Sequence, residues 1–177
     1  MKNKRYEREV FIKTAYNIVK KYGFENLTVR RLSTYLRISS GPIYIQFKNI
    51  QEIKDEVVIM IFEKMIKESE SKPFYESVIA YYPVQIIMFG LSHPLLFEAG
   101  WKDDRGNPKL MYELFEKFLL TYGITTGDFR EMNLQDKRKY IQKVVMSILG
   151  LFDTIHILNI TDKQEIAKMW MNLLSRF

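Results

Sequence analysis

Residues 27–49 read LTVRRLSTYLRISSGPIYIQFKN, two helical patterns with a break between them. Thr28 is a good N-cap for a short helix in which apolar residues recur every three or four positions. The pattern breaks at Arg37. Ser39 or Ser40 can then cap a new helix with Pro42 in its first turn, where a missing N–H costs nothing. Two short helices joined by a tight turn predict a helix-turn-helix, whose second helix fits the major groove of DNA.

Helical patterns also flank this stretch. Apolar residues from Val10 to Tyr22 keep helical spacing and stop at Gly23, a residue that commonly ends helices. A long helical pattern begins at Asn49 and continues to about Glu70. We therefore expect residues 1–50 to form a three-helix DNA-binding domain, linked by a helix over 49–70 to the rest of the chain.

The charge distribution agrees with a head that binds a polyanion. Residues 1–55 carry a net charge of +7, whereas residues 56–177 carry −1. Such asymmetry favours nucleic acid as a partner, with a solvated lysine-rich surface as the alternative. The 177-residue chain has no cysteine, which excludes disulfides and thiolate metal sites, and its 47% apolar content is enough for a core.

Residues 51–177 are expected to form a second helical domain that binds an effector and dimerises. Lys72–Pro73 interrupts the pattern, and 102–108 (KDDRGNP) is a strong loop signal. No strand-like alternation appears, so the predicted fold is all-α. The expected helices cover 74–89, 93–101, 107–122, 136–158 and 161–177, with Thr161 as an N-cap and 123–132 ambiguous.

The head also carries an ordered set of residues in ungapped spacing over roughly residues 8–57. These are Ile12-x-x-Ala15-x-x-Ile18, Tyr22-Gly23-Phe24, Leu27-Thr28-Val29-Arg30-x-Leu32 and Ile38-Ser39-x-Gly41-x-Ile43-Tyr44-x-x-Phe47-x-Asn49. This pattern resembles the N-terminal domain of the tetracycline-repressor (TetR) family of bacterial transcription regulators. The remaining two thirds match only the family's general plan of a divergent helical body.

Three positions depart from the family pattern. Arg37 stands where the turn usually has glycine or another small residue. Gln46 replaces a frequent histidine, and Ile50 replaces a lysine that commonly touches phosphate. Lys48 and Lys54 can compensate for that lysine. These departures put single contacts in doubt.

Ten residues of the head are candidate DNA contacts: Thr28, Arg30, Arg37, Ser39, Ser40, Gly41, Pro42, Tyr44, Gln46 and Lys48. Thr28 and Arg30 open the second helix, where a phosphate can dock on a helix N-terminus. The resemblance implies that Tyr44 bonds a phosphate, with core packing as the alternative. Arg37 and Lys48 are further phosphate candidates, and for each a solvated surface charge is an equal alternative.

The other candidates lie along the recognition helix. Ser39 and Ser40 stand at its start, where Ser40 can bond a phosphate or a base edge while also capping the helix. Gly41 and Pro42 leave the first turn nearly bare, which allows apolar contact with a thymine methyl group; simple helix initiation is the alternative. Gln46 can read adenine or contact only the DNA backbone.

The second domain is rich in aromatic residues, and the resemblance implies an effector cavity there. Such a composition suits a small apolar or aromatic ligand, although aromatic residues at helical spacing also build ordinary cores. The candidate ligand-binding residues are Tyr81, Phe89, Trp101, Tyr112, Phe115, Phe152 and His156. The chain has only two histidines and no HExxH-type spacing, so we expect no metal site and no cofactor.

One short recognition helix supplies little specificity, which predicts a homodimer on a palindromic operator. We expect it to form through helices 136–158 and 161–177. The stripe from Ile141 to Ile155, with Met169, Trp170 and Phe177, offers more apolar surface than a helix pair can bury internally. Closure of the monomer core is the alternative.

The resulting prediction is a cytoplasmic, ligand-responsive transcriptional regulator, acting as a repressor that a small effector releases. The chain shows no secretory signal and no apolar run long enough to span a membrane. The alternative is a helical carrier of lipids or other hydrophobes with a basic, membrane-facing patch. An enzyme is not expected, because no nucleophile–base pair, phosphate-binding glycine loop or metal signature is visible.

Overall fold

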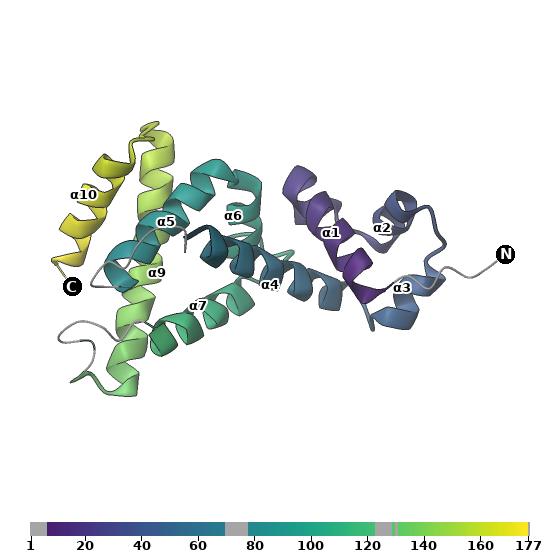
Figure 1. The fold of residues 1–177 in the computed structure, drawn as a ribbon, viewed down its shortest axis with the longest axis horizontal. Coiled ribbons are helices and arrows are strands. Elements are labelled where there is room, and N and C mark those ends of the chain that lie inside the picture. The colour runs from purple at the N-terminus through teal and green to yellow at the C-terminus, as the bar shows by residue number, and fades with distance from the viewer. Residues whose placement is uncertain (1–6, 70–77, 123–128, 130, 177) are drawn as a thin grey trace. The chain divides into compact units, whose positions relative to one another are not determined.

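The computed structural model describes residues 7–69, 78–122, 129 and 131–176, and every regular element in these ranges is a helix. The chain divides into two compact units (Figure 1). The first comprises Met1–Glu63 and Leu95–Met111, and the second comprises Lys64–Pro94 and Tyr112–Phe177. The predicted all-α fold is confirmed. The expected helix start at Phe74 and most of the ambiguous segment 123–132 lie outside the described residues.

The first unit contains the predicted helix-turn-helix. Its elements are α1 (Arg8–Tyr22), the 3-10 turn η1 (Phe24–Asn26), α2 (Val29–Leu36), α3 (Gly41–Gln46), most of α4 (Ile50–Ser69) and α6 (Pro94–Trp101). α1 packs against η1 and α2. Phe11 of α1 meets Phe47 edge to face, with ring centroids 5.9 Å apart, so the residue after α3 is anchored on α1.

Local signals determine where the first helices begin and end. Gly23 has φ +75°, a left-handed conformation that suits glycine, and its N–H bonds the carbonyl of Val19. The Thr28 side chain accepts a hydrogen bond from the Arg31 N–H at 3.1 Å, so the predicted N-cap of α2 is confirmed. The Asn49 side chain likewise accepts from the Glu52 N–H at the start of α4.

The second unit holds the end of α4, α5 (Val78–Ser92), most of α7 (Pro108–Tyr122), α9 (Leu134–Ile157) and α10 (Lys163–Leu174). α5 packs against α9 and α10. α9 begins two residues before its predicted start, because Asn133 caps it by accepting the Asp136 N–H. The prediction of Thr161 as an N-cap is wrong: Asp162 accepts the Glu165 N–H at 2.8 Å, which places the start of α10 one residue later.

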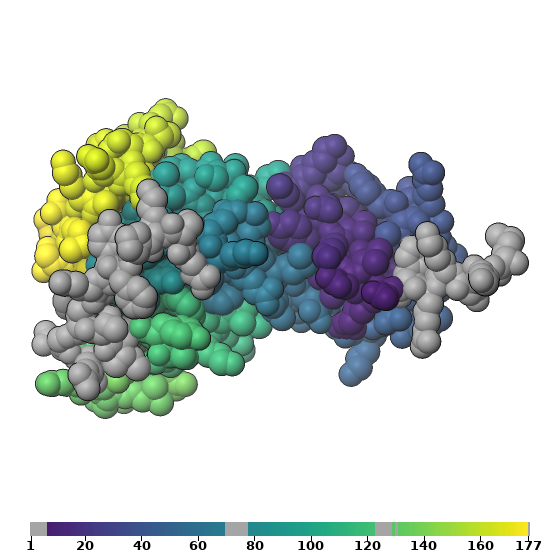
Figure 2. Space-filling view, in the orientation of Figure 1, coloured from purple at the N-terminus to yellow at the C-terminus, as the bar shows by residue number. Residues whose placement is uncertain are grey.

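A proline inside α5 leaves a backbone carbonyl that α10 satisfies. Pro83 has no N–H, so the carbonyl of Ile79 four residues earlier loses its helical donor. The fully buried indole N–H of Trp170 donates to that carbonyl at 3.1 Å. In Figure 2 the yellow atoms of α10 lie directly against the teal atoms of α5. The Trp170 side chain of α10 therefore supplies the hydrogen-bond donor that this carbonyl of α5 would otherwise lack.

The α9 residues that were expected to cover a dimer interface are instead buried within the chain, as is Trp170; Met169 is half-buried, and Phe177 lies outside the described residues. Every α9 residue of the stripe and Trp170 of α10 are at most 7% exposed. The large apolar residues that these two helices leave exposed are different ones: Leu134, Met146, Ile157 and Met171; Leu158, directly after α9, is exposed as well. The prediction was therefore wrong for the α9 stripe and for Trp170, because helical periodicity identifies an apolar face and not the neighbour that covers it.

Candidate nucleic-acid interface

The turn between α2 and α3 is built on a left-handed arginine. Arg37 has φ 55° and ψ 45°, and its N–H bonds the Thr34 carbonyl at 3.1 Å. The next residue, Ile38, donates to the Ser33 carbonyl at 3.0 Å, which completes the helix end. A left-handed conformation costs a residue with a side chain about 1–2 kcal/mol. Arg37 is exposed to solvent, and it adopts a backbone conformation that glycine adopts at a lower cost in free energy.

Helix α3, the predicted recognition helix, is short and has two distinct faces. Ile43 and the following Phe47 are buried and attach it to the unit. Gly41, Tyr44 and Ile45 are exposed on α3, and Lys48, just beyond the helix, is exposed as well. Tyr44 is 58% exposed, which decides against the core-packing alternative for this residue.

Arg8 of α1 holds the C-terminal end of α3 in place. One of its guanidinium nitrogens donates to the Gln46 carbonyl at 2.6 Å, and the other bonds Glu52 and Glu56 of α4 at 2.7 and 2.9 Å. The same guanidinium lies 4.2 Å from the centroid of the Phe47 ring. A charged donor on a helix C-terminal carbonyl is favourable, so Arg8 links the recognition helix to two others.

Glu52 reinforces this arrangement from α4. It accepts the Lys48 N–H at 2.8 Å in addition to its ion pair with Arg8. The Lys48 backbone bond, followed by the Arg8 bond, lowers the pKa of the Glu52 carboxyl below its ordinary value. The contact with Arg8 could not be foreseen from the sequence, because residue 8 and residue 52 are 44 positions apart and no periodicity relates them.

The structure places most of the predicted DNA contacts at the surface. Pro42 and Gln46 are half-buried, whereas the other eight are exposed: Thr28, Arg30, Arg37, Ser39, Ser40, Gly41, Tyr44 and Lys48. The residues from Arg37 to Lys48 follow one another through the turn and α3. Thr28 and Arg30 stand at the start of α2.

Ser40 occupies the N-cap position of α3 but does not cap it with its side chain. Its backbone is already helical, with φ −71° and ψ −20°, whereas a capping residue is normally extended. Its carbonyl instead accepts the N–H groups of Ile43 and Tyr44. Of the two predicted N-cap residues, Ser39 and Ser40, the structure thus has Ser40 at the N-cap position, without a hydrogen bond from its side chain to the helix.

Arg31 differs from its neighbour Arg30. Its guanidinium bonds the Asn26 side chain and lies 4.4 Å from the centroid of the Tyr22 ring. Arg31 thus joins α2 to the end of α1 and to η1. The exposed cations of this region are Arg30, Arg37 and Lys48.

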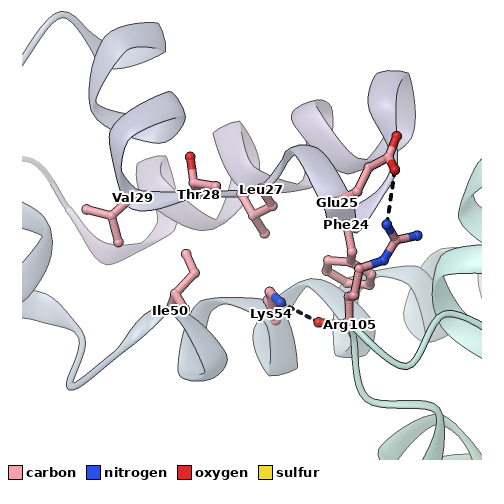
Figure 3. A pocket seen from close by; sticks show the side chains of 8 residues that line it. All are labelled: Phe24, Glu25, Leu27, Thr28, Val29, Ile50, Lys54 and Arg105. Atoms are coloured by element: carbon pink, nitrogen blue, oxygen red, sulfur yellow. Dashed lines mark hydrogen bonds and ion pairs between the residues drawn. The ribbon is translucent and has the colours of Figure 1, made fainter.

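A groove of about 310 Å³ lies in the same unit (Figure 3). Phe24, Glu25, Leu27, Thr28, Val29, Ile50, Lys54 and Arg105 line it. Arg105, from the loop between α6 and α7, bonds Glu25 at 3.0 Å and Asp103 at 2.8 Å, and Lys54 donates to the Arg105 carbonyl. The guanidinium is thus already paired with two carboxylates. These contacts attach the α6–α7 loop to η1 and α4.

Gly106 tightens that attachment. A Cβ placed on it would lie 2.6 Å from the Phe24 ring, closer than real contacts allow. Asn107 follows, donating to Asp55 at 3.0 Å and accepting the Leu110 N–H at the start of α7. The sequence motif 102–108 indicated a loop, but its packing on the first unit was not predicted.

The seven candidate ligand residues are distributed over both units. Trp101 belongs to the first unit, and Tyr81, Phe89, Tyr112, Phe115, Phe152 and His156 belong to the second. Phe89, Phe115 and Phe152 are buried, whereas His156 is exposed and stacks on Phe152 with centroids 6.1 Å apart.

Two tyrosines of this set make polar contacts. The Tyr81 hydroxyl donates to the Ser69 carbonyl at 2.8 Å. Burial, followed by the neighbouring Glu116 carboxylate, raises the pKa of Tyr112 above its ordinary value. Glu116 is also 3.6 Å from Arg138 of α9. A polar cluster thus adjoins the aromatic residues between α7 and α9.

Two further features can be stated for the described part of the chain. No group of three or more His, Asp or Glu side chains there is arranged to hold a metal ion. No helix within the described ranges combines the length and apolarity that crossing a membrane requires.

The arrangement defines a class of fold: an all-helical chain with an N-terminal helix-turn-helix unit and a helical second unit. No protein-family model and no curated protein matches the chain. It matches a crystal structure of the multidrug binding protein EbrR complexed with imidazole, over 96% of this chain and 92% of that one. The TM-score is 0.62 and the sequence identity 12%. EbrR is a TetR-family regulator, so the resemblance noted in the sequence is confirmed at the level of the fold.

Proposed function

We propose that this chain is a ligand-responsive transcriptional regulator. It acts as a repressor that binds a palindromic operator as a homodimer and is released by a small, largely apolar effector. In this proposal residues 1–50 bind DNA, residues 51–177 bind the effector and dimerise, and the protein works in the cytoplasm. The observation that carries it is the exposed face of α3, held in place from behind by Arg8 and bordered by exposed cations.

Charge supports DNA as the partner. From residue 26 to residue 51 the chain has four cations and no acidic residue. Arg30, Arg37 and Lys48 are exposed there and can each approach a phosphate, whereas Arg31 is engaged within the fold. Phosphate contacts position a protein on the duplex, and base contacts by α3 then supply specificity.

A homodimer suits the exposed apolar residues of α9 and α10. Met146 is 72% exposed and Ile157 74%, and between them Gly150 has open space where a Cβ would stand. Burial of such residues against a second copy would remove apolar surface from water. Sedimentation of the wild type should give a dimer that Met146→Glu weakens. Asn17→Glu, which adds the same charge at an exposed position of α1 in the first unit, is the matched control.

The effector is proposed to bind among the aromatic residues of the second unit. EbrR, which has a similar fold, is described as multidrug binding and was crystallised in complex with imidazole, and this supports a small-molecule effector. An effector can release the protein from DNA only if it binds two conformations of the protein with unequal affinity. The chain passes between the units at α4, at the start of α6 and in α7, and these are the proposed routes of coupling.

The direct test is an operator titration. Operator DNA is first enriched from a random duplex library, and binding is then followed by fluorescence anisotropy against scrambled DNA. We expect a preference of at least about 10³-fold, and an effector that lowers it. Weak, equal binding to both DNAs would refute the proposal. Binding to anionic vesicles without DNA binding would support a membrane-facing carrier instead.

A further inference from the structure

Ile45 stands out on the surface of the first unit. Its side chain is 83% exposed, more than any other large apolar side chain in the described part of the chain. Ile43, two positions earlier, is 1% exposed, so α3 places one isoleucine in the core and the other in solvent. A single exposed apolar residue needs no explanation in itself, and the meaning of Ile45 comes from its surroundings.

The neighbours of Ile45 form an exposed face of α3 that is bordered by positively charged side chains. Gly41 and Tyr44 share its side of α3, and the exposed Lys48 follows two residues after the helix ends. The exposed Arg30 and Arg37 come from the same acid-free stretch, residues 26–51. An apolar patch bordered by exposed cations, in a stretch without acidic residues, suits a polyanion that offers an apolar group and does not suit an apolar protein face.

Gly41 supports close approach at this face. It has no positive φ, and a Cβ added to it would meet only the Ser39 hydroxyl, at 3.9 Å. The fold itself therefore has room for a side chain at this position. A bare position next to Ile45 leaves space for an external surface to come close.

We infer that Ile45 reads the 5-methyl group of a thymine in the major groove. That methyl is the apolar group that B-DNA presents there, and it distinguishes thymine from cytosine. An isoleucine side chain has no donor or acceptor, so its contribution is methyl recognition and not a hydrogen bond. The inference rests on the proposed DNA-binding function and adds a specificity-determining residue to it.

The test removes one methyl group at a time. In the enriched operator, each thymine is replaced singly by deoxyuracil, which lacks only the 5-methyl group, and affinity is measured by anisotropy. Burial of one methyl group corresponds to about a fourfold change in affinity. We expect such a loss at one position in each half-site for the wild type, and no loss at that position for Ile45→Ala.

Controls separate this contact from general weakening. Ile45→Val retains a branched side chain and should retain the deoxyuracil penalty. Tyr122→Ala, at an exposed aromatic residue of α7 in the second unit, should leave it unchanged. Circular dichroism should show that Ile45→Ala folds, because the side chain is almost fully in solvent.

Two outcomes would overturn the inference, and they can be distinguished. If an operator is enriched and every deoxyuracil substitution acts equally on wild type and Ile45→Ala, the inference fails and the proposed function stands. If no sequence is enriched and DNA binding is weak and unspecific, the proposed function fails and the inference fails with it.

Discussion

Replacing Trp170 with phenylalanine is expected to lower the free energy of unfolding of the second unit by more than the lost packing contacts alone would. The Trp170 indole N–H is the donor, at 3.1 Å, for the Ile79 carbonyl that Pro83 leaves without a helical partner. Phenylalanine keeps an aromatic ring there but has no donor. An unsatisfied buried carbonyl costs about 1–3 kcal/mol, in addition to the packing loss.

A double-mutant cycle isolates the hydrogen bond. In a Pro83→Ala background, the N–H of the new alanine can donate to the Ile79 carbonyl within α5. Trp170→Phe should then cost at least about 1 kcal/mol less than it does in the wild type, because only packing is lost. Urea unfolding followed by far-ultraviolet circular dichroism measures all four proteins. Equal costs in the two backgrounds would refute the reasoning.

Three further predictions concern the first unit. Gly41→Ala should stabilise the fold by about 0.4–1 kcal/mol in thermal unfolding, because the protein has room for the added methyl group. It should also weaken operator binding, because in the complex the same methyl group would meet the DNA. Undiminished DNA binding would contradict this. Arg37→Gly should relieve the left-handed strain and raise the melting temperature. It should also reduce the salt slope of DNA binding by about 0.9 for each phosphate that the variant no longer neutralises, and an unchanged slope would remove Arg37 from the interface. The lowered pKa of Glu52 means that its charge stabilises the fold above its ordinary pKa of 4.5, and that this stabilisation is lost as pH falls through the lower folded-state pKa. Melting temperatures measured from neutral pH down to below that folded-state pKa should therefore fall less for Glu52→Gln than for the wild type, whereas parallel profiles would show that the carboxylate contributes nothing.

Local features of the fold could be predicted because each depends on a few adjacent residues. The glycine that ends α1, the Thr28 cap of α2 and the loop over 102–108 follow from neighbours in sequence. The same local reasoning failed at the start of α10, where Thr161 and Asp162 are adjacent capping residues. The observed cap is Asp162, with Glu165 three residues later, a spacing typical of helix starts.

Contacts between distant positions could not be predicted. Nothing in the sequence relates Arg8 to Glu52, Arg105 to Glu25 or Trp170 to Ile79, although these pairs position the recognition helix, the α6–α7 loop and α10. The apolar face of α9 was identified by its periodicity, yet periodicity does not say which neighbour covers a face.

The candidate DNA contacts from the sequence all lie in one unit, whereas the candidate effector residues are divided between the two units. A recognition helix is a short continuous segment, so its exposed residues can be read in order from Arg37 to Lys48. An effector site is assembled from several helices, and residues chosen for aromatic character alone fell in both units, with Trp101 in the first and Phe152 in the second. Ile45, which is 83% exposed, was not among the candidates from the sequence.

The central claim is that the first unit reads a specific DNA sequence, and the most direct measurement is the salt dependence of operator affinity. Anisotropy titrations of enriched and scrambled DNA at several salt concentrations would give both the specificity ratio and the number of phosphates contacted. The proposal predicts a ratio of at least about 10³ that persists as salt rises, with a steep slope for both DNAs. Equal affinities for the two DNAs at every salt concentration would contradict the claim.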